Sequence, residues 1–161
     1  MKNKEHLPIF GIGPFLVAGM ALTTAIAIVL FYYIFNIGTL NSFTAMLLCA
    51  AGVVLIITGV DVWFIRAVRS NMDKNIKENR FKTTAIYAWV RNPMYSGWWI
   101  LFSGVSLLWH NILLLPVIFI NWGIMTIVLK NTEEKWLHNF YGQEYEDYCK
   151  HVNRCIPWKR S

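Results

Sequence analysis

The sequence predicts an all-α integral membrane protein, a single bundle of about four transmembrane helices followed by a cytoplasmic C-terminal helical tail. Hydrophobic residues make up 56% of the 161 residues, and the mean hydropathy is +0.41. A water-soluble domain of this length needs more polar surface. The apolar residues also form long runs, and a helix needs about 20 such residues to cross a hydrocarbon core.

Four apolar runs give the helices in chain order, at residues 9–35, 42–65, 93–109 and 112–129. The third run is short for a span, so it begins a turn earlier, crosses a thinned region or re-enters the side it came from. The two-residue connection His110-Asn111 makes the third and fourth helices an antiparallel pair. Small residues inside the helices should allow close helix contacts; these are Gly52, Gly59, Gly104 and Gly123.

The basic residues indicate how the chain is oriented. All 15 Lys and Arg residues lie before the first run, between the second and third, or after the fourth. The positive-inside rule therefore places both termini and the middle loop in the cytoplasm. Basic segments there suit the anionic headgroups of membrane lipids. Since the charge follows topology and not one helical face, no nucleic-acid partner is predicted. The N-terminal run is too long for a signal peptide and lacks a cleavage site, so we expect a retained helix.

The segments outside the runs are polar. The middle loop, residues 66–89, shows no steady period. The tail should be helical, because Asn131 resembles an N-cap with Glu134 reaching back to it. After Gly142, a second piece places apolar side chains at i, i+3, i+4 and i+7; these are Tyr145, Tyr148, Cys149 and Val152. We expect both pieces to lie along the membrane surface beneath the hairpin.

The cysteines give no metal or disulfide signal. Cys149 and Cys155 lie in the tail, in a reducing compartment, so no disulfide is expected. Together with His138 and His151 their spacing fits no common zinc pattern. No metal site is therefore predicted.

The segment 87–99 carries the first group of residues suited to chemistry. Asn92-Pro93 stops a preceding helix and starts the third one, whose first amides form an anion site beside Arg91. Gly97, one turn on, lets a ligand approach the backbone. Five aromatic rings there can stack on a flat base or attract a sulfonium; these are Tyr87, Trp89, Tyr95, Trp98 and Trp99. The alternative is a plain interfacial aromatic belt.

Acidic residues form the second group. Acids are common at a helix start, but Glu133-Glu134, facing the aromatic and cationic segment, can also bind ribose hydroxyls or an ammonium group. Asp61 lies in the second helix near its cytoplasmic end, and an acid inside the membrane is a functional candidate. An ion pair of Asp61 with Arg66 or Arg91 is an equal alternative.

These two groups resemble the isoprenylcysteine carboxyl methyltransferase family. Residues 87–97 resemble its pattern Tyr-x-x-x-Arg-His-Pro-x-Tyr-x-Gly, and Glu133-Glu134 with residues 140–157 resembles its C-terminal signature. The likeness covers about residues 80–157, the expected cofactor-binding core of a single 1–161 domain. It implies a membrane methyltransferase that uses S-adenosylmethionine. The implied cofactor contacts, by matching position, are Asn79, Arg80, Phe81, Lys82, Tyr87, Asn92, Pro93, Met94, Tyr95 and Glu133.

The sequence departs from the family pattern at two positions, one an expected contact of the cofactor and one an expected contact of the methyl acceptor. Asn92 replaces the histidine of the pattern; it still donates a hydrogen bond but carries no charge. The eukaryotic carboxyl methyltransferases carry an arginine four residues before the matching glutamate. Here that position is Leu129, with Lys130 beside it. The cofactor half of the resemblance is therefore better supported than the acceptor half.

We therefore expect methyl transfer from S-adenosylmethionine to a lipophilic acceptor that enters between the helices, by an in-line displacement that depends on positioning and exclusion of water. A carboxylate acceptor would be held by Lys130, Arg91 or Arg154. An amine acceptor would need a base, with Glu133, Glu134 and Asp61 as the options. Two alternatives are a phospholipid amine methyltransferase, whose Gly-x-Gly box is not evident, and a non-enzymatic membrane scaffold. The oligomeric state is not indicated.

Overall fold

The computed structural model describes residues 11–69 and 85–156, and its regular elements there are helical, as predicted. In chain order they are α1 (Gly13–Ile28) with a π-helical continuation (Val29–Ile34), α2 (Ser42–Arg69), a 3-10 turn (Ala85–Ala88), α4 (Pro93–Leu108), a second 3-10 turn (Ile112–Leu114), α5 (Leu115–Asn131), α6 (Glu133–Tyr141) and α7 (Gln143–His151).

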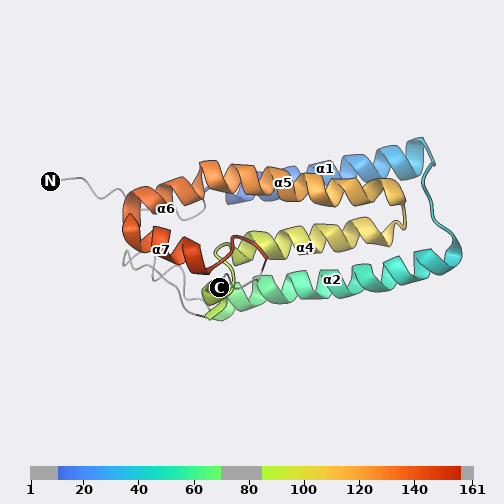
Figure 1. The fold of residues 1–161 in the computed structure, drawn as a ribbon. Helices are drawn as coiled ribbons and strands as arrows, with labels where there is room; N and C mark the ends of the chain where they lie inside the picture. Colours follow the sequence, from blue (N-terminus) through green and yellow to red (C-terminus); the bar gives the residue numbers. More distant parts are fainter. Residues whose placement is uncertain (1–10, 70–84, 157–161) are drawn as a thin grey trace.

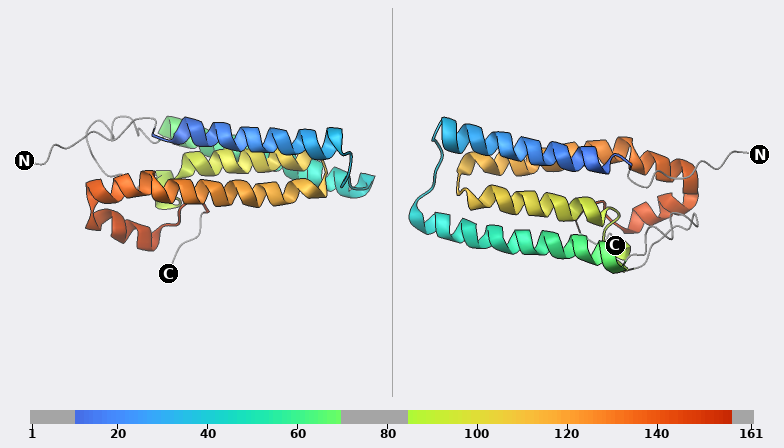
Figure 2. Two further views of the ribbon diagram at one scale, coloured as in Figure 1. Left: turned by 90° about the horizontal axis from the view of Figure 1, so that it is seen from above. Right: turned by 180° about the vertical axis from the view of Figure 1, so that it is seen from behind.

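The four long helices run side by side along one axis (Figure 1). α4 is central in this bundle, since it packs on α1, α2 and α5. Figure 2 shows the same arrangement from above and from behind. The start of α1, the end of α2, the start of α4 and the end of α5 lie at one end, next to α6 and α7. Both predicted functional segments are therefore at that end.

Within residues 11–69 and 85–156, three helical segments are long and apolar enough to cross a membrane: Gly13–Ile34, Ser42–Ile65 and Ile112–Tyr141. α4 has 16 residues, about 24 Å at 1.5 Å per residue, against about 30 Å for a hydrocarbon core. The third run is thus short, as expected. It is nevertheless one unbroken helix that reaches the far end of the bundle, so it does not turn back as a re-entrant loop (Figure 1).

The outward face of α2 is apolar. Phe43 is 67% exposed, Val54 61% and Phe64 58%. Such a surface is unfavourable in water, where large exposed apolar patches mark contact with a membrane or another protein. These side chains are suited to lipid, in agreement with an integral membrane protein.

Glycines bring α2 and α4 into backbone contact. A Cβ on Gly59 would lie 2.7 Å from the carbonyl oxygen of Gly97, and one on Gly104 would lie 2.6 Å from that of Gly52. Small residues matter here because lipid provides no hydrophobic drive between helices, so close packing must hold them together. The prediction is confirmed for Gly52, Gly59 and Gly104. It is wrong for Gly123, whose added Cβ would meet nothing within 4 Å.

Asn111 ties the two connections at the far end of the bundle together. Its side-chain nitrogen donates to the Ile37 carbonyl at 2.7 Å, and its oxygen accepts from the Leu113 amide at 2.9 Å. The Leu40 amide also donates to the His110 carbonyl at 3.1 Å. Asn111 is only 2% exposed, and a buried amide must satisfy its polar groups in this way.

A second buried amide joins α1 to α5. The Asn121 side chain donates to Thr24 Oγ1 at 3.1 Å and accepts from Thr23 Oγ1 at 2.6 Å. Hydrogen bonds between apolar helices act as polar contacts that fix their relative position. They hold α1 in register against α5, so the start of α1 reaches the end of the bundle that carries the predicted site.

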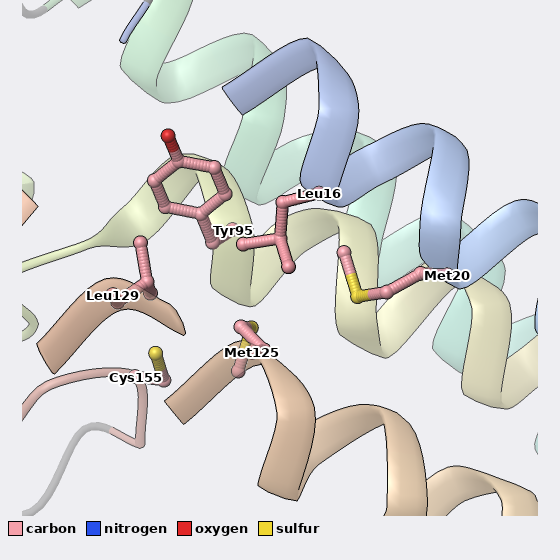
Figure 3. Close-up of a cluster of buried hydrophobic side chains, with 6 residues drawn as sticks. All are labelled: Leu16, Met20, Tyr95, Met125, Leu129 and Cys155. Atoms are coloured by element: carbon pink, nitrogen blue, oxygen red, sulfur yellow. The ribbon is translucent and has the colours of Figure 1, made fainter. Parts of the chain in front are cut away.

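A buried cluster lies just inside that end. Figure 3 shows its members, which come from α1, α4, α5 and the C-terminal tail: Leu16, Met20, Tyr95, Met125, Leu129 and Cys155. Met125 and Leu129 are fully buried. Cys155 belongs to this cluster because the chain after α7 returns to the end of the bundle. We call this set the apolar column.

Candidate functional site

The C-terminal tail binds the segment that leads into α4 through its backbone. The Arg91 amide donates to the Asn153 carbonyl and the Asn92 amide to the Arg154 carbonyl, each at 2.9 Å. The Tyr148 hydroxyl adds a hydrogen bond to the Tyr87 carbonyl at 2.5 Å. The two sequence segments expected to form one site are therefore held against each other.

Glu134 joins the same segments through its side chain. Arg154 donates to both carboxylate oxygens, at 2.6 Å from Nε and 2.8 Å from Nη2. Arg91 Nη2 lies 3.5 Å from Glu134 Oε1. A two-point arginine–carboxylate pair is strong and sets its own geometry. With only 9% of Glu134 exposed, it ties α6, the entry to α4 and the tail together.

The predicted helix cap at Asn131 is wrong. α5 continues through Asn131, and Thr132 is the residue before α6. The Thr132 hydroxyl donates to the Val128 carbonyl at 2.7 Å and caps nothing. Glu134 does not reach back to a cap, because the arginines hold its carboxylate.

The titratable groups of the tail are set by burial and by this ion pair. The hydrogen bond to Glu134 raises the pKa of Arg154 above its ordinary value. Burial raises the pKa of Tyr145, and the nearby Glu134 charge adds to the effect. Burial also raises the pKa of Tyr148 and raises the pKa of Cys155 to about 11. The arginine is therefore charged, and both phenols and the thiol are neutral, at physiological pH.

Glu133, the adjacent acid, meets different surroundings. The Tyr95 hydroxyl donates to its carboxylate. The start of α1 lies over this pair, since a Cβ on Gly11 would be 2.9 Å from Glu133 Oε1 and one on Gly13 2.9 Å from the Tyr95 hydroxyl. Figure 3 shows that Tyr95 also forms one end of the apolar column, with its hydroxyl pointing away from Met125. A carboxylate, a phenol and an apolar wall thus meet at one point.

Asn92 presents a buried hydrogen-bond donor immediately before the start of α4. It is 8% exposed, and its carbonyl accepts from the Ser96 amide at 3.1 Å and hydroxyl at 3.0 Å. Its side-chain nitrogen has no hydrogen-bond partner among residues 11–69 and 85–156. Leaving a buried donor unpaired is unfavourable, so this nitrogen is suited to a ligand. Pro93 starts α4 as predicted.

A basic cleft of about 570 Å³ opens on the Glu134 side of α6. Neither Glu133 nor Tyr95 lines it. Its walls come from the end of α5, from α6 and α7, and from the two arginines. The charged side chains that line it are Arg91, Lys130, Lys135, Lys150, Arg154, Glu134 and Glu146.

The other residues predicted from sequence lie in several places. Tyr87 is buried, and Met94 packs against the apolar column. The close approach that Gly97 permits is to α2. Asp61 is exposed on α2 and forms no ion pair with Arg91, which pairs with Glu134. The predicted contacts that lie outside the described residues are Asn79, Arg80, Phe81 and Lys82.

Sequence reasoning missed the contribution of the start of α1. Gly11 and Gly13 leave room for the Tyr95–Glu133 pair. The signal for them was two glycines, separated by a single residue, at the head of an apolar run. It also missed the backbone pairing of residues 153 and 154, for which the tail carries no local signal.

Comparisons with known proteins agree with the predicted resemblance. The family model described as phospholipid methyltransferase matches residues 40–144. Methanethiol S-methyltransferase 1 of Bradyrhizobium diazoefficiens is 34% identical over 82 residues, covering 51% of this chain and 28% of that protein. Protein-S-isoprenylcysteine O-methyltransferase of Schizosaccharomyces pombe is 35% identical over 91 residues, covering 52% of this chain and 36% of that protein. The Saccharomyces cerevisiae protein of the same name is 37% identical over 78 residues, covering 47% of this chain and 31% of that protein.

These matches span only 28% to 36% of the relatives' own length. No solved structure matches. The family model, however, covers both α4 and the acidic pair at the start of α6, which are the parts that meet at the site. The chain therefore belongs to the phospholipid methyltransferase family, and its resemblance to the isoprenylcysteine methyltransferases is confirmed.

Proposed function

We propose that this protein transfers a methyl group from S-adenosylmethionine to a lipophilic acceptor at the end of the bundle that carries α6 and α7. Family membership supports the reaction class. The observation that carries the proposal is the contact of Tyr95 with Glu133 at the head of the apolar column, with the buried, unpaired amide nitrogen of Asn92 at the start of the helix that carries Tyr95.

The residues present fit the cofactor. Asn92 Nδ2 is a buried donor suited to the carboxylate of the methionine part. Glu133 is an acceptor suited to ribose hydroxyls, and Tyr87 and Tyr95 supply aromatic rings at the same end. We assign Asn79 to Lys82 as further contacts by motif position. When bound, S-adenosylmethionine supplies a methyl group on a sulfonium sulfur.

The chain itself positions the acceptor and excludes water, which is most of what an in-line displacement requires. Met125 and Leu129 make the surroundings of Tyr95 apolar, so a lipophilic acceptor suits this position. An acceptor with an ionisable proton also needs a base. Among the three predicted bases we propose Glu133, because Glu134 is held by two arginines and Asp61 lies outside the site on α2.

A carboxylate acceptor would need a cation. Arg91 and Arg154 both contact Glu134, so such an acceptor would compete with Glu134 for them. Lys130 has no ion pair in the described part of the chain, but it lines the basic cleft and not the side of α6 that carries Glu133, so we assign it no role in methyl transfer.

The test has two parts, binding and chemistry. Titrating S-adenosylmethionine into the purified, detergent-solubilised protein should give saturable binding that Glu133→Gln and Tyr95→Phe weaken. Glu144→Gln, an exposed acid on α7, is the matched control. Labelled-methyl transfer is then compared for a prenylcysteine analogue, a long-chain thiol and an aminophospholipid. If the parent protein binds no S-adenosylmethionine, the scaffold alternative replaces this proposal.

We also propose that the site lies on the cytoplasmic face, because the basic residues gather at this end and the other two connections contain none. A protease-sensitive tag placed after residue 161 should be cleaved from the cytoplasmic side of sealed vesicles. Protection of the tag there would reverse the topology.

A further inference from the structure

The basic cleft on the Glu134 side of α6 has a surplus of positive charge after its ion pairs are counted. Glu134 is paired with Arg91 and Arg154, and Glu146 contacts His138 Nε2 at 2.5 Å. Lys150 pairs with Asp147 at 2.7 Å. Lys130 and Lys135, in contrast, form no ion pair within residues 11–69 and 85–156. Two ammonium groups therefore face the same cleft without an ion-pair partner in the described part of the chain.

The inner wall of the cleft adds a buried donor. The Arg91 side chain is only 10% exposed, and its Nε has no hydrogen-bond partner among the residues that the structure describes. An unpaired buried donor is unfavourable. A phosphate group would supply acceptor oxygens to it, and arginine and lysine together are well suited to bind phosphate.

The position of the cleft points to a membrane lipid as the source of that phosphate. Lys130 is in the last turn of α5, directly after the apolar run that ends at Leu129 inside the candidate span Ile112–Tyr141. Above it, the outer face of α5 exposes large apolar side chains, with Phe119 70% and Ile127 61% exposed. Acyl chains lying along this face would place their headgroup at Lys130. Basic pockets at the cytoplasmic ends of membrane helices bind anionic headgroups in this way.

We propose that the cleft between Lys130, Lys135 and Arg91 binds the phosphate of an anionic phospholipid. The site is separate from the Tyr95–Glu133 pair, because adjacent residues of a helix point about 100° apart and neither residue of that pair lines the cleft. The proposal does not depend on methyl transfer, so failure of one does not bear on the other.

The experiment measures the melting temperature of the purified full chain in detergent while lipid is titrated. The probes are phosphatidylglycerol, phosphatidylcholine as the zwitterionic control, and inorganic phosphate. A ligand that binds the folded state raises the melting temperature saturably. Phosphatidylglycerol should do so, and Lys130→Gln/Lys135→Gln should bind it about thirtyfold more weakly, about fivefold for each lysine.

Two further variants separate a site from bulk charge. Lys130→Arg/Lys135→Arg keeps the charge and should keep the affinity. Lys2→Gln/Lys4→Gln makes the same change in net charge outside the described residues and should also leave it unchanged. Equal affinity of the parent and Lys130→Gln/Lys135→Gln, or no preference for phosphatidylglycerol over phosphatidylcholine, overturns the proposal. An equal shift with inorganic phosphate keeps the anion site but rejects a lipid as its source.

Discussion

Glu133 and Glu134 are neighbours with nearly the same sequence environment, yet they lie in opposite surroundings. Glu134 is held by two arginines and joins three separate segments of the chain. Glu133 meets a phenol at the head of the apolar column, beneath the start of α1. The comparison shows that an acidic pair in a motif need not act as a pair. One carboxylate holds three segments together, and the other is the one that we propose to contact the cofactor.

Glu134→Gln should have the largest effect, and the effect should be on stability. The substitution removes the charge that neutralises Arg91 and Arg154. Removing one partner of a buried ion pair lowers the free energy of unfolding by about 3 kcal/mol or more. We expect about 3 kcal/mol here, because this pair is not fully enclosed. Denaturant unfolding in detergent, followed by circular dichroism, measures it. If Glu133→Gln destabilises the protein as much as Glu134→Gln does, the assignment of the structural role to Glu134 alone is wrong.

Cys155 should be alkylated about a hundredfold more slowly at pH 8 in the folded protein than in the unfolded chain. Burial raises the pKa of Cys155 from an ordinary 9.0 to about 11, which lowers its thiolate fraction by about that factor, and the thiolate is the reactive form. The same cysteine in the denatured protein serves as the comparison. Since the folded-state pKa is raised, the stability contributed by the Cys155 thiol is present below pH 9 and is lost as the pH rises towards 11.

Mass spectrometry of peptides after timed alkylation gives both rates. In Glu134→Gln, release of the tail should make Cys155 react faster. An unchanged Cys155 rate in that variant would show that the ion pair does not hold the tail in place.

Glu133→Gln should act mainly on the cofactor. A hydrogen bond to a charged group contributes about 1.5–3 kcal/mol, so affinity for S-adenosylmethionine should fall about tenfold or more while the melting temperature changes little. Tyr95→Phe should also weaken the binding of S-adenosylmethionine. In the double variant the loss of binding free energy should be smaller than the sum of the two single losses, because the two side chains are in contact. Isothermal titration provides the dissociation constants. Additive losses would mean that the two residues act independently.

Gly13→Ala should have the smallest effect, and that effect should be on the Tyr95–Glu133 pair. The new methyl group would lie 2.9 Å from the Tyr95 hydroxyl, and overpacking of this kind costs about 1 kcal/mol or more. We expect about a fivefold loss of cofactor affinity. Gly19→Ala in the same helix is the matched control, because its Cβ would meet nothing within 4 Å. Similar losses in both variants would point to a general effect of helix α1.

The sequence alone determined the long helices of this protein and which of them run antiparallel to one another. Each apolar run is a local property of the chain, and the ends of α2 and α4 lie within a few residues of the predicted bounds. Pro93 had to start a helix, and the His110-Asn111 connection had to reverse the chain. These facts already bring the Arg-Asn-Pro segment and the acidic pair to one end of the bundle.

The tertiary structure alone decided which side chain does what at that end. A helix turns about 100° per residue, so the direction of Glu133 and Glu134 depends on where α6 starts after the break at Thr132. That start was predicted wrongly because it is fixed by contacts with Arg91 and Arg154, which are remote in sequence. For the same reason no local pattern showed that Gly97 packs on α2, or that the chain after α7 pairs with Arg91 and Asn92.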